Sequence, residues 1–377
     1  MSRRLIHLAE PVLTGNEKKY LQECLDTGWI SGSGKFVDAF EDGFAAFCGA
    51  THGVAIVNGT AALHVALLAL GIGPGDEVII PDLTYIASAN AVTYCGARPI
   101  FSDVDPATWT LNPQDVARKL SPRTKAIMPV HLYGHPVDMD PILDLAKAHN
   151  LYVVEDAAEA HGAEYKGRRV GALGDIGVFS FYGNKIITTG EGGMIVTNNS
   201  ALADRARLLK GQGMDPQHRY WFPIIGYNYR MTNMQAAIGL AQLERIEWFI
   251  ERRREVAEWY DISLKSLPVV KPVEADWAKN SYWLYSICVD EKIDRDLLMN
   301  HLLERGVETR PFFYPMHQMP PYRDAVHEAT PIATKLGAQG LSLPSSANLS
   351  REDVAHIARA LEECLAKQND HQAVGRA

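Results

Sequence analysis

The chain has 377 residues, which predicts two domains because a single hydrophobic core rarely grows to this size. Hydrophobic residues make up 47% and charged residues 22%, as in ordinary globular proteins, so a disordered chain is excluded. The net charge of −8 argues against a protein that binds nucleic acid or an anionic membrane, since both need a basic face.

Short apolar runs alternate with helical patterns through the first two-thirds of the chain. Most of the runs are continuously apolar, which is typical of a sheet buried on both faces. The alternation predicts an α/β domain whose ligands bind at the carboxyl ends of the strands. We predict strands at residues 77–80, 98–101, 126–130, 151–154, 177–181 and 194–197, with helices such as 61–70 and 139–149 between them.

The pattern changes after a long helical segment at residues 233–264. The following elements predict a smaller α+β domain: a strand at 281–289, a helix at 295–305 and a final helix at 352–367. We therefore expect a large domain at residues 1–245, which includes the N-terminal segment, and a small C-terminal domain at residues 246–377.

Cysteine and histidine usage indicates neither a disulfide framework nor a metal site. Five cysteines are scattered without a C-x-x-C pair. His131 and His135 have i, i+4 spacing, but they follow a strand and precede Pro136, so we predict no metal there. An N-terminal arginine pair is followed by only two apolar residues, too few for a signal peptide, and the expected location is the cytoplasm, away from membranes.

A carboxylate, Asp156, stands directly after the apolar run that ends in Val153 and Val154. At the ligand-binding edge of a sheet it could hold a cationic ring nitrogen, a metal or a ribose. It could equally cap the next helix. This segment alone leaves the catalytic and the structural role equally open.

A lysine, Lys185, follows the predicted strand at 177–181 and precedes a glycine-rich turn at 190–193. Most lysines are solvated, but this one is flanked by Phe181 and Ile186, which predicts burial of at least its backbone. Desolvation lowers the pKa of an amine, and a neutral amine can attack a carbonyl. The position therefore suits a Schiff-base lysine.

Two polar turns could bind phosphate. Asn58, Gly59 and Thr60 open a predicted helix, whose free N–H groups attract anions, although the same turn could be a simple N-cap. Asn228 and Arg230 open another helix and could contact phosphate or order a loop. The sequence contains no G-x-x-x-x-G-K-[ST] loop, no G-x-G-x-x-G after the first strand and no G-x-S-x-G, which disfavours nucleotide hydrolysis, dinucleotide binding and an α/β hydrolase.

In this order and spacing, the segments 155–158, 180–185, 190–193 and 226–231 resemble the DegT/DnrJ/EryC1/StrS nucleotide-sugar aminotransferases. The resemblance covers nearly the whole chain. It implies a fold-type I transferase, similar to aspartate aminotransferase, with a large mixed-sheet α/β/α domain and a smaller α+β domain. It also implies pyridoxal 5′-phosphate as cofactor.

The resemblance assigns a role to each candidate residue. Lys185 bonds to the cofactor and then acts as the base that shuttles a proton, Asp156 pairs with the pyridine nitrogen, and Glu159 approaches the ring hydroxyl. The remaining cofactor-binding residues are Tyr85, stacked on the ring, and Gly59, Thr60 and Ser180 on the phosphate, joined by Asn228 from a second subunit. A homodimer with shared active sites is therefore implied.

Within this family, residues 181–193, 211–216 and 219–223 are most similar to the GDP-perosamine synthases, although Tyr182 stands where Phe is commoner. These enzymes transfer an amino group from L-glutamate to carbon 4 of GDP-4-keto-6-deoxy-D-mannose, for O-antigen or other surface polysaccharides (lipopolysaccharide biosynthesis). Candidate sugar contacts are Arg219, Tyr220, Trp221 and His317.

Three alternatives keep the fold. The substrate could be a UDP- or dTDP-linked keto sugar, because the cofactor residues would be the same. A sugar dehydratase is disfavoured, because dehydratases of this fold carry histidine at the position of Lys185. A non-catalytic regulatory protein is disfavoured by the joint presence of Lys185, Asp156 and Ser180.

Overall fold

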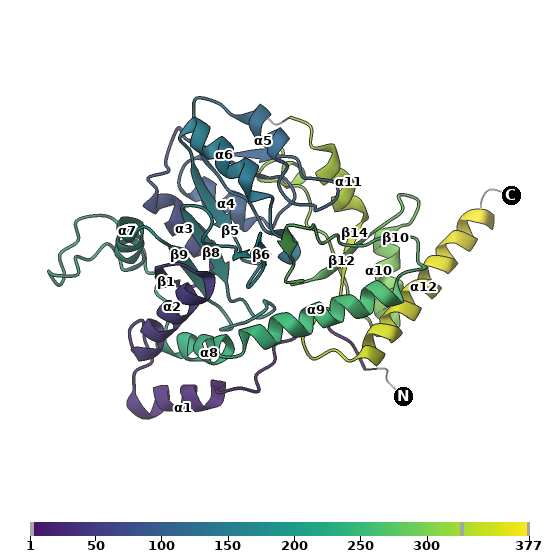
Figure 1. The fold of residues 1–377 in the computed structure, drawn as a ribbon, viewed down its shortest axis with the longest axis horizontal. Coiled ribbons are helices and arrows are strands. Elements are labelled where there is room, and N and C mark those ends of the chain that lie inside the picture. The colour runs from purple at the N-terminus through teal and green to yellow at the C-terminus, as the bar shows by residue number, and fades with distance from the viewer. Residues whose placement is uncertain (1–3, 325–327, 375–377) are drawn as a thin grey trace.

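The computed structural model describes residues 4–324 and 328–374, and its central element is a seven-stranded mixed sheet (Figure 1). The strand order is β1-β9-β8-β5-β4-β2-β3. Strands β3, β2, β4, β5 and β8 run parallel, whereas β9 is antiparallel to β8 and β1 is antiparallel to β9. The strands are β1 (His52–Ile56), β2 (Glu77–Pro81), β3 (Arg98–Ser102), β4 (Thr124–Ile127), β5 (Tyr152–Asp156), β8 (Ile176–Ser180) and β9 (Gly193–Thr197).

Helices cover both faces of this sheet, which explains why its strands are continuously apolar. Val178 packs on one face in a cluster that includes α3 and α4, while the next residue, Phe179, packs on the other face against Phe40 and Phe44 of α2. The helices of this part are α1 (Glu17–Thr27), α2 (Lys35–Cys48), α3 (Gly59–Ala69), α4 (Ala87–Tyr94), α5 (Pro113–Lys119), α6 (Met139–His149), α7 (Ser200–Lys210) and α8 (Asn233–Leu243).

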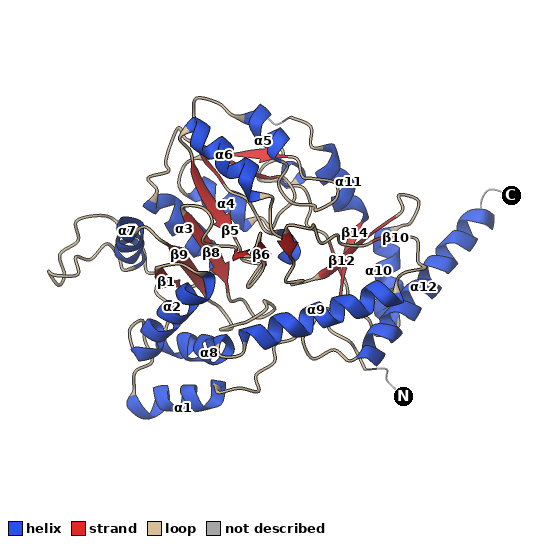
Figure 2. Cartoon of the chain, in the orientation of Figure 1, coloured by secondary structure: helices blue, strands red, loops and turns tan. Residues whose placement is uncertain are grey.

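A second, four-stranded antiparallel sheet lies in the C-terminal part (Figure 2). This part has its own core, which includes Tyr260 and Tyr285. Its strands are β10 (Val269–Val270), β12 (Tyr285–Val289), β14 (Gly340–Leu343) and β13 (Arg310–Pro311). The helices here are α9 (Ile246–Ser263), α10 (Arg295–Glu304), α11 (Pro331–Gln339) and α12 (Arg351–Val374). A small sheet of β6 (Glu164–Tyr165), β7 (Arg168–Arg169) and β11 (Ala278–Lys279) links residues from both halves of the chain.

Two helix predictions were wrong in extent. The helix expected at 233–264 is broken at residues 244–245, between α8 and α9, and the last helix runs on to Val374. The N-terminal segment lies against the C-terminal part, because Ile6 pairs with Val307 and Ser345 N–H donates to the Leu8 carbonyl (2.8 Å). The division into domains at residue 245 stays a prediction.

Candidate active site

The predicted cofactor residues lie at the carboxyl edge of the large sheet. Neighbouring parallel strands β5 and β8 end in Asp156 and Ser180, so both side chains reach the same edge. Lys185 follows β8 by one tight turn, in which its N–H donates to the Tyr182 carbonyl (2.9 Å). Asp156 and Lys185 thus lie close enough to interact electrostatically, because the strands before them are adjacent and parallel.

The Lys185 side chain is 11% exposed, and its Nζ lies 3.6 Å from Glu159 Oε1. Burial lowers the pKa of the amine, while the negative charges of Glu159 and Asp156 oppose that shift. The net effect is a lowered pKa, so the amine is neutral more often than it would be in solution. This is the state in which an amine attacks a carbonyl.

Asp156 is 5% exposed and accepts hydrogen bonds from Ser88 Oγ (2.8 Å) and from Ala158 N–H (3.2 Å). Burial raises its pKa in spite of these two donors and the nearby Lys185 charge. A buried carboxylate with too few compensating charges is a site for a cation, such as a protonated ring nitrogen. The sequence pattern did not reveal Ser88, although it follows closely after Tyr85 in the chain.

Glu159 bridges Lys185 and a neighbouring loop. Its Oε2 accepts a hydrogen bond from Tyr133 N–H (2.9 Å), and Tyr133 adopts a left-handed backbone conformation with φ of 53°. Burial raises the pKa of Glu159 to about 7, against the effect of the Lys185 charge. Near neutral pH this carboxylate can therefore both take up and release a proton.

The three candidate phosphate contacts from this chain lie where α3 begins. A Cβ atom on Gly59 would lie 2.8 Å from Ser180 Cβ, so only glycine allows the helix end to approach β8 this closely. Asn58 caps the helix by accepting from Ala61 N–H (2.8 Å), which leaves the first turn, Gly59 and Thr60, at the open end. The structure thus brings the three same-chain phosphate candidates together.

Two aromatic residues border the site. Tyr85 is 57% exposed, and its ring centroid lies 5.6 Å from that of Phe313, which stacks on Tyr133. Trp283, from the C-terminal half, lies over the Lys185 amine, with 3.8 Å between Nζ and the ring centroid. No sequence signal pointed to Trp283, because it is remote from Lys185 in the chain and belongs to no motif.

The remaining candidates are not gathered around Lys185. Arg219, Tyr220 and Trp221 lie in a loop that projects beyond α7 (Figure 1), and Asn228 is at the base of this loop, paired with Gly211. Tyr220 and Trp221 are 72% and 66% exposed.

His317, the fourth predicted sugar contact, lies at the end of β2. Its Nδ1 is 2.5 Å from Asp82 Oδ2, and its N–H donates to Asp82 Oδ1 (3.0 Å). Asp82 directly follows the last residue of β2 and stands shortly before Tyr85, so His317 reaches the same edge of the sheet as the cofactor residues.

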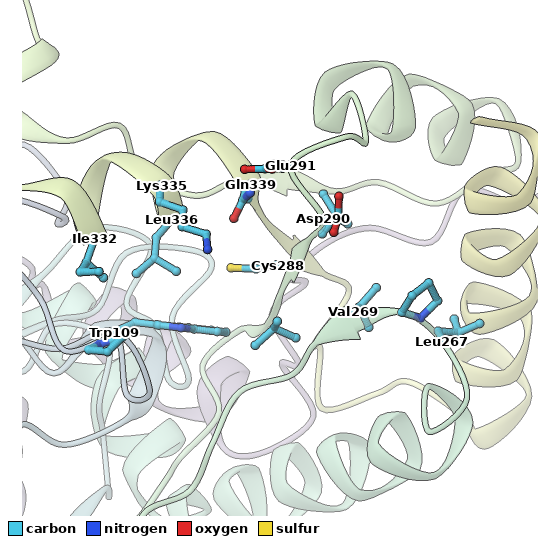
Figure 3. Close-up of a pocket in the computed structure, with 14 residues that line it drawn as sticks. Trp109, Leu267, Val269, Cys288, Asp290, Glu291, Ile332, Lys335, Leu336 and Gln339 are labelled. Carbon is cyan, nitrogen blue, oxygen red and sulfur yellow. The ribbon is translucent and has the colours of Figure 1, made fainter. Parts of the chain in front are cut away.

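A cavity of about 620 Å³ lies elsewhere, between β12 and α11 (Figure 3). Trp109, Cys288, Lys335 and Leu336 face it, and none of the described residues that line it belongs to the predicted site. Among residues 4–324 and 328–374, no group of three or more histidines, cysteines or acidic residues could hold a metal ion. None of the helices in the described part combines the length and the apolar character that a bilayer crossing requires.

These residues fit pyridoxal phosphate. The cofactor has an anionic phosphate, a ring nitrogen that can be protonated and an aldehyde. The chain offers a glycine-lined helix end beside Ser180, the buried carboxylate of Asp156 and the desolvated amine of Lys185. Each chemical feature of the cofactor thus has a complementary group at one edge of the sheet.

Comparison with known proteins agrees with this chemistry. The model of the DegT/DnrJ/EryC1/StrS aminotransferase family matches residues 11–362. The chain is 54% identical over 364 residues to a GDP-perosamine synthase of Caulobacter vibrioides, and 51% identical over 360 residues to one of Escherichia coli O157:H7. Each alignment covers 96% of this chain and 98% of the relative.

Solved structures extend the comparison to the fold. The aminotransferase TlmJ from Streptoalloteichus hindustanus superposes with a TM-score of 0.92 at 34% identity, over 97% of this chain and all of that one. DesI, solved in the presence of its TDP-sugar product, has the same TM-score and identity, over all of this chain and 97% of that one. The fold-type I architecture is thereby confirmed, and the chain belongs to the pyridoxal-phosphate-dependent DegT/DnrJ/EryC1/StrS aminotransferase family.

Proposed function

We propose that this aminotransferase transfers an amino group from L-glutamate to carbon 4 of GDP-4-keto-6-deoxy-D-mannose, which gives GDP-perosamine. The observation that carries the proposal is the buried amine of Lys185 beside the carboxylates of Glu159 and Asp156, at the ligand-binding edge of the sheet. The identity of 54% to a GDP-perosamine synthase supports the choice of sugar. The product serves O-antigen or another surface polysaccharide.

Pyridoxal phosphate supplies an aldehyde that bonds to amines and a ring that absorbs carbanion charge. We assign its pyridine nitrogen to Asp156, its ring hydroxyl to Glu159 and its ring face to Tyr85. The phosphate is assigned to the open end of α3 and its neighbours: Gly59, Thr60, Ser180 and, from a second subunit, Asn228.

We assign proton transfer during the reaction to two side chains of this protein, Lys185 and Glu159. Burial lowers the pKa of Lys185 and so favours the neutral amine that can bond to a carbonyl; once released, this amine can take a proton from one carbon atom and return it to another. Glu159, with its pKa near 7 and 3.6 Å away, can exchange a proton with that amine. Because both side chains are buried, this exchange is shielded from bulk water.

Glutamate and the keto sugar use the same site in turn, so we expect ping-pong kinetics. Product-inhibition patterns that require a ternary complex would contradict this expectation. We assign nucleotide and hexose contacts to Arg219, Tyr220 and Trp221 of the projecting loop and to His317.

A substrate panel tests the choice of sugar. With glutamate as donor, GDP-4-keto-6-deoxy-D-mannose should be aminated at least about 10²-fold faster, in kcat/KM, than UDP- or dTDP-linked 4-keto sugars, because buried polar contacts reject a base that cannot pair with them. Formation of 2-oxoglutarate in the absence of any sugar is the control for a competent enzyme. Preferential turnover of the UDP or dTDP compound would replace the perosamine assignment and leave the aminotransferase class intact.

We further propose that the enzyme is a homodimer whose sites are completed by the projecting loop. The loop exposes Tyr220, Trp221, Phe222 and Ile225, the last at 89%, and large apolar side chains grouped on one projecting loop favour contact with another surface. The two chain segments at the base of this loop are hydrogen-bonded to each other, since Gln212 N–H donates to the Tyr227 carbonyl (2.8 Å). This bond fixes the direction in which the loop leaves the subunit.

Subunit complementation tests the shared site. Lys185→Ala and Asn228→Ala homodimers should each turn over poorly, but a mixture exchanged by mild denaturation should recover up to about a quarter of wild-type activity, because half of the dimers are mixed and each has one intact site. Unmixed samples taken through the same treatment are the control. Full activity of the Asn228→Ala protein, or no recovery in a mixture shown to contain mixed dimers, contradicts the assignment.

The same proposal includes the organisation and location of the enzyme. We infer a large domain at residues 1–245 and a small domain at residues 246–377, although the strand pairing of Ile6 with Val307 ties the first residues to the second domain. Glutamate and nucleotide sugars are cytoplasmic metabolites, which favours a cytoplasmic enzyme.

A further inference from the structure

We propose that Trp283 is a positioning residue of the aminotransferase reaction, which holds the Lys185 amine beneath its ring and anchors the main chain just before it. The amine lies 3.8 Å from the ring centroid, and the indole Nε1–H donates to the carbonyl of Asn184 (2.8 Å). One side chain therefore contacts both ends of the lysine: its charged tip and the peptide bond at its backbone. The inference rests on the proposed role of Lys185.

Trp283 is itself rigidly held. It is 4% exposed, and its carbonyl accepts a hydrogen bond from Arg253 Nη1 (2.7 Å), which also donates to the Ser345 carbonyl (2.8 Å). Arg253 belongs to α9 and is 3% exposed. The C-terminal half of the chain thus places a fixed aromatic surface against a lysine that belongs to the N-terminal half.

The other groups near the Lys185 amine are titratable side chains, and the ring of Trp283 differs from them. Glu159 lies 3.6 Å from the amine, and Asp156 also acts on it electrostatically. His161 lies close enough to be influenced by the lysine charge, but burial lowers the pKa of His161 to about 3, so this imidazole is neutral. Trp283 is the contact from the C-terminal half, and it carries no titratable group.

An indole face stabilises an ammonium ion but cannot accept its proton. During transamination the amine has to gain a proton and release it again. Glu159 stabilises the charged amine, but it can also take the proton from that amine, because the pKa of the carboxylate is about 7. Trp283 offsets part of the desolvation of the ammonium form without such competition, and its N–H is already used by Asn184.

The test is the pKa of the Lys185 amine in the full-length, cofactor-free protein, measured from the pH dependence of its acetylation rate by peptide mass spectrometry. Replacement of Trp283 alone by mono-, di- and trifluorotryptophan keeps the shape and the N–H but weakens the ring quadrupole. We expect the pKa of Lys185 to fall stepwise along this series, by about one unit in total. The same shift should appear in the kcat–pH profile of the holoenzyme, with KM for the keto sugar unchanged.

Two substitutions separate the two contacts. Trp283→Phe removes the indole N–H but keeps a weaker aromatic face, so it should lower the pKa of Lys185 less than Trp283→Leu, which should also reduce kcat by about tenfold. Trp109→Leu is the matched control, because Trp109 is also 4% exposed and belongs to the same buried hydrophobic cluster as Trp283 but lines the cavity between β12 and α11. It should lower the melting temperature and leave the pKa unchanged.

An unchanged pKa across the fluorotryptophan series would overturn the inference, even if the leucine variant failed to fold. So would an equal shift in the Trp109→Leu control. These outcomes concern only Trp283. Failure of the proposed role of Lys185 would appear separately, as a Lys185→Ala holoenzyme that keeps its visible absorbance and its turnover.

Discussion

Replacing Lys185 by alanine is expected to remove the long-wavelength absorbance of the bound cofactor and to lower kcat/KM by more than about 10³-fold, since we propose that this one residue supplies both the covalent attachment and the base. The physical reason is the position of the amine, 11% exposed and 3.6 Å from Glu159. The measurements are an absorbance spectrum of the protein with added pyridoxal phosphate and the rate of 2-oxoglutarate formation from glutamate.

Lys210→Met is the matched control. Lys210 is also buried, with 13% of its side chain exposed, and burial lowers its pKa too, but it is paired with Glu41 between α2 and α7 (Nζ–Oε1 2.8 Å). Its loss should reduce stability and leave the cofactor absorbance in place. A Lys185→Ala protein that retains a wild-type spectrum and turnover would show that another amine is the reactive one.

The second large effect is expected for Asp156→Asn, which preserves the shape of the side chain but removes its charge. We expect kcat/KM to fall by about 10²- to 10³-fold, because in the proposed arrangement the ring nitrogen loses the buried partner that stabilises its proton. The amide oxygen of the variant can still accept from Ser88 or Ala158, so the fold should be retained. The measurement is the rate of each half-reaction, together with the affinity for pyridoxal phosphate.

Asp115→Asn gives a control for the loss of a buried carboxylate. Asp115 is 3% exposed and accepts from Ser102 Oγ (2.9 Å) and Asp103 N–H (2.6 Å), outside the site. Its replacement should lower the melting temperature without a comparable loss of kcat/KM. If Asp156→Asn kept more than about half of the wild-type kcat/KM, the ring nitrogen would need another partner.

The short apolar runs, which alternate with helical patterns along the chain, were sufficient to predict most strands of the large sheet. The strand predicted at 77–80 is observed as Glu77–Pro81, and the helix predicted at 139–149 has the same bounds in the structure. Such elements can be predicted because apolar runs and helical periodicity are local patterns in the sequence. The strand β1 (His52–Ile56), which pairs antiparallel with β9, was not predicted, although its residues 54–56 form a short apolar run.

The break between α8 and α9, in contrast, could not be predicted from local sequence patterns. Residues 233–264 read as one helix because every residue near 244–245 is a good helix former, yet the chain turns there. The Glu244 carboxylate accepts from Tyr20 and Asn16 of the N-terminal region, contacts that no periodicity in residues 233–264 could indicate.

The amino-acid order alone was enough to predict the burial of Lys185 and Asp156, because each follows an apolar run, whereas their proposed roles come from the resemblance to the aminotransferase family. Both residues are placed by strands whose ends are visible in the sequence. What surrounds them, such as Ser88 on Asp156 and Trp283 on Lys185, became known only from the folded chain. Those contacts, a hydrogen bond and a cation–π contact, join residues far apart in the chain, so no local sequence pattern indicates them.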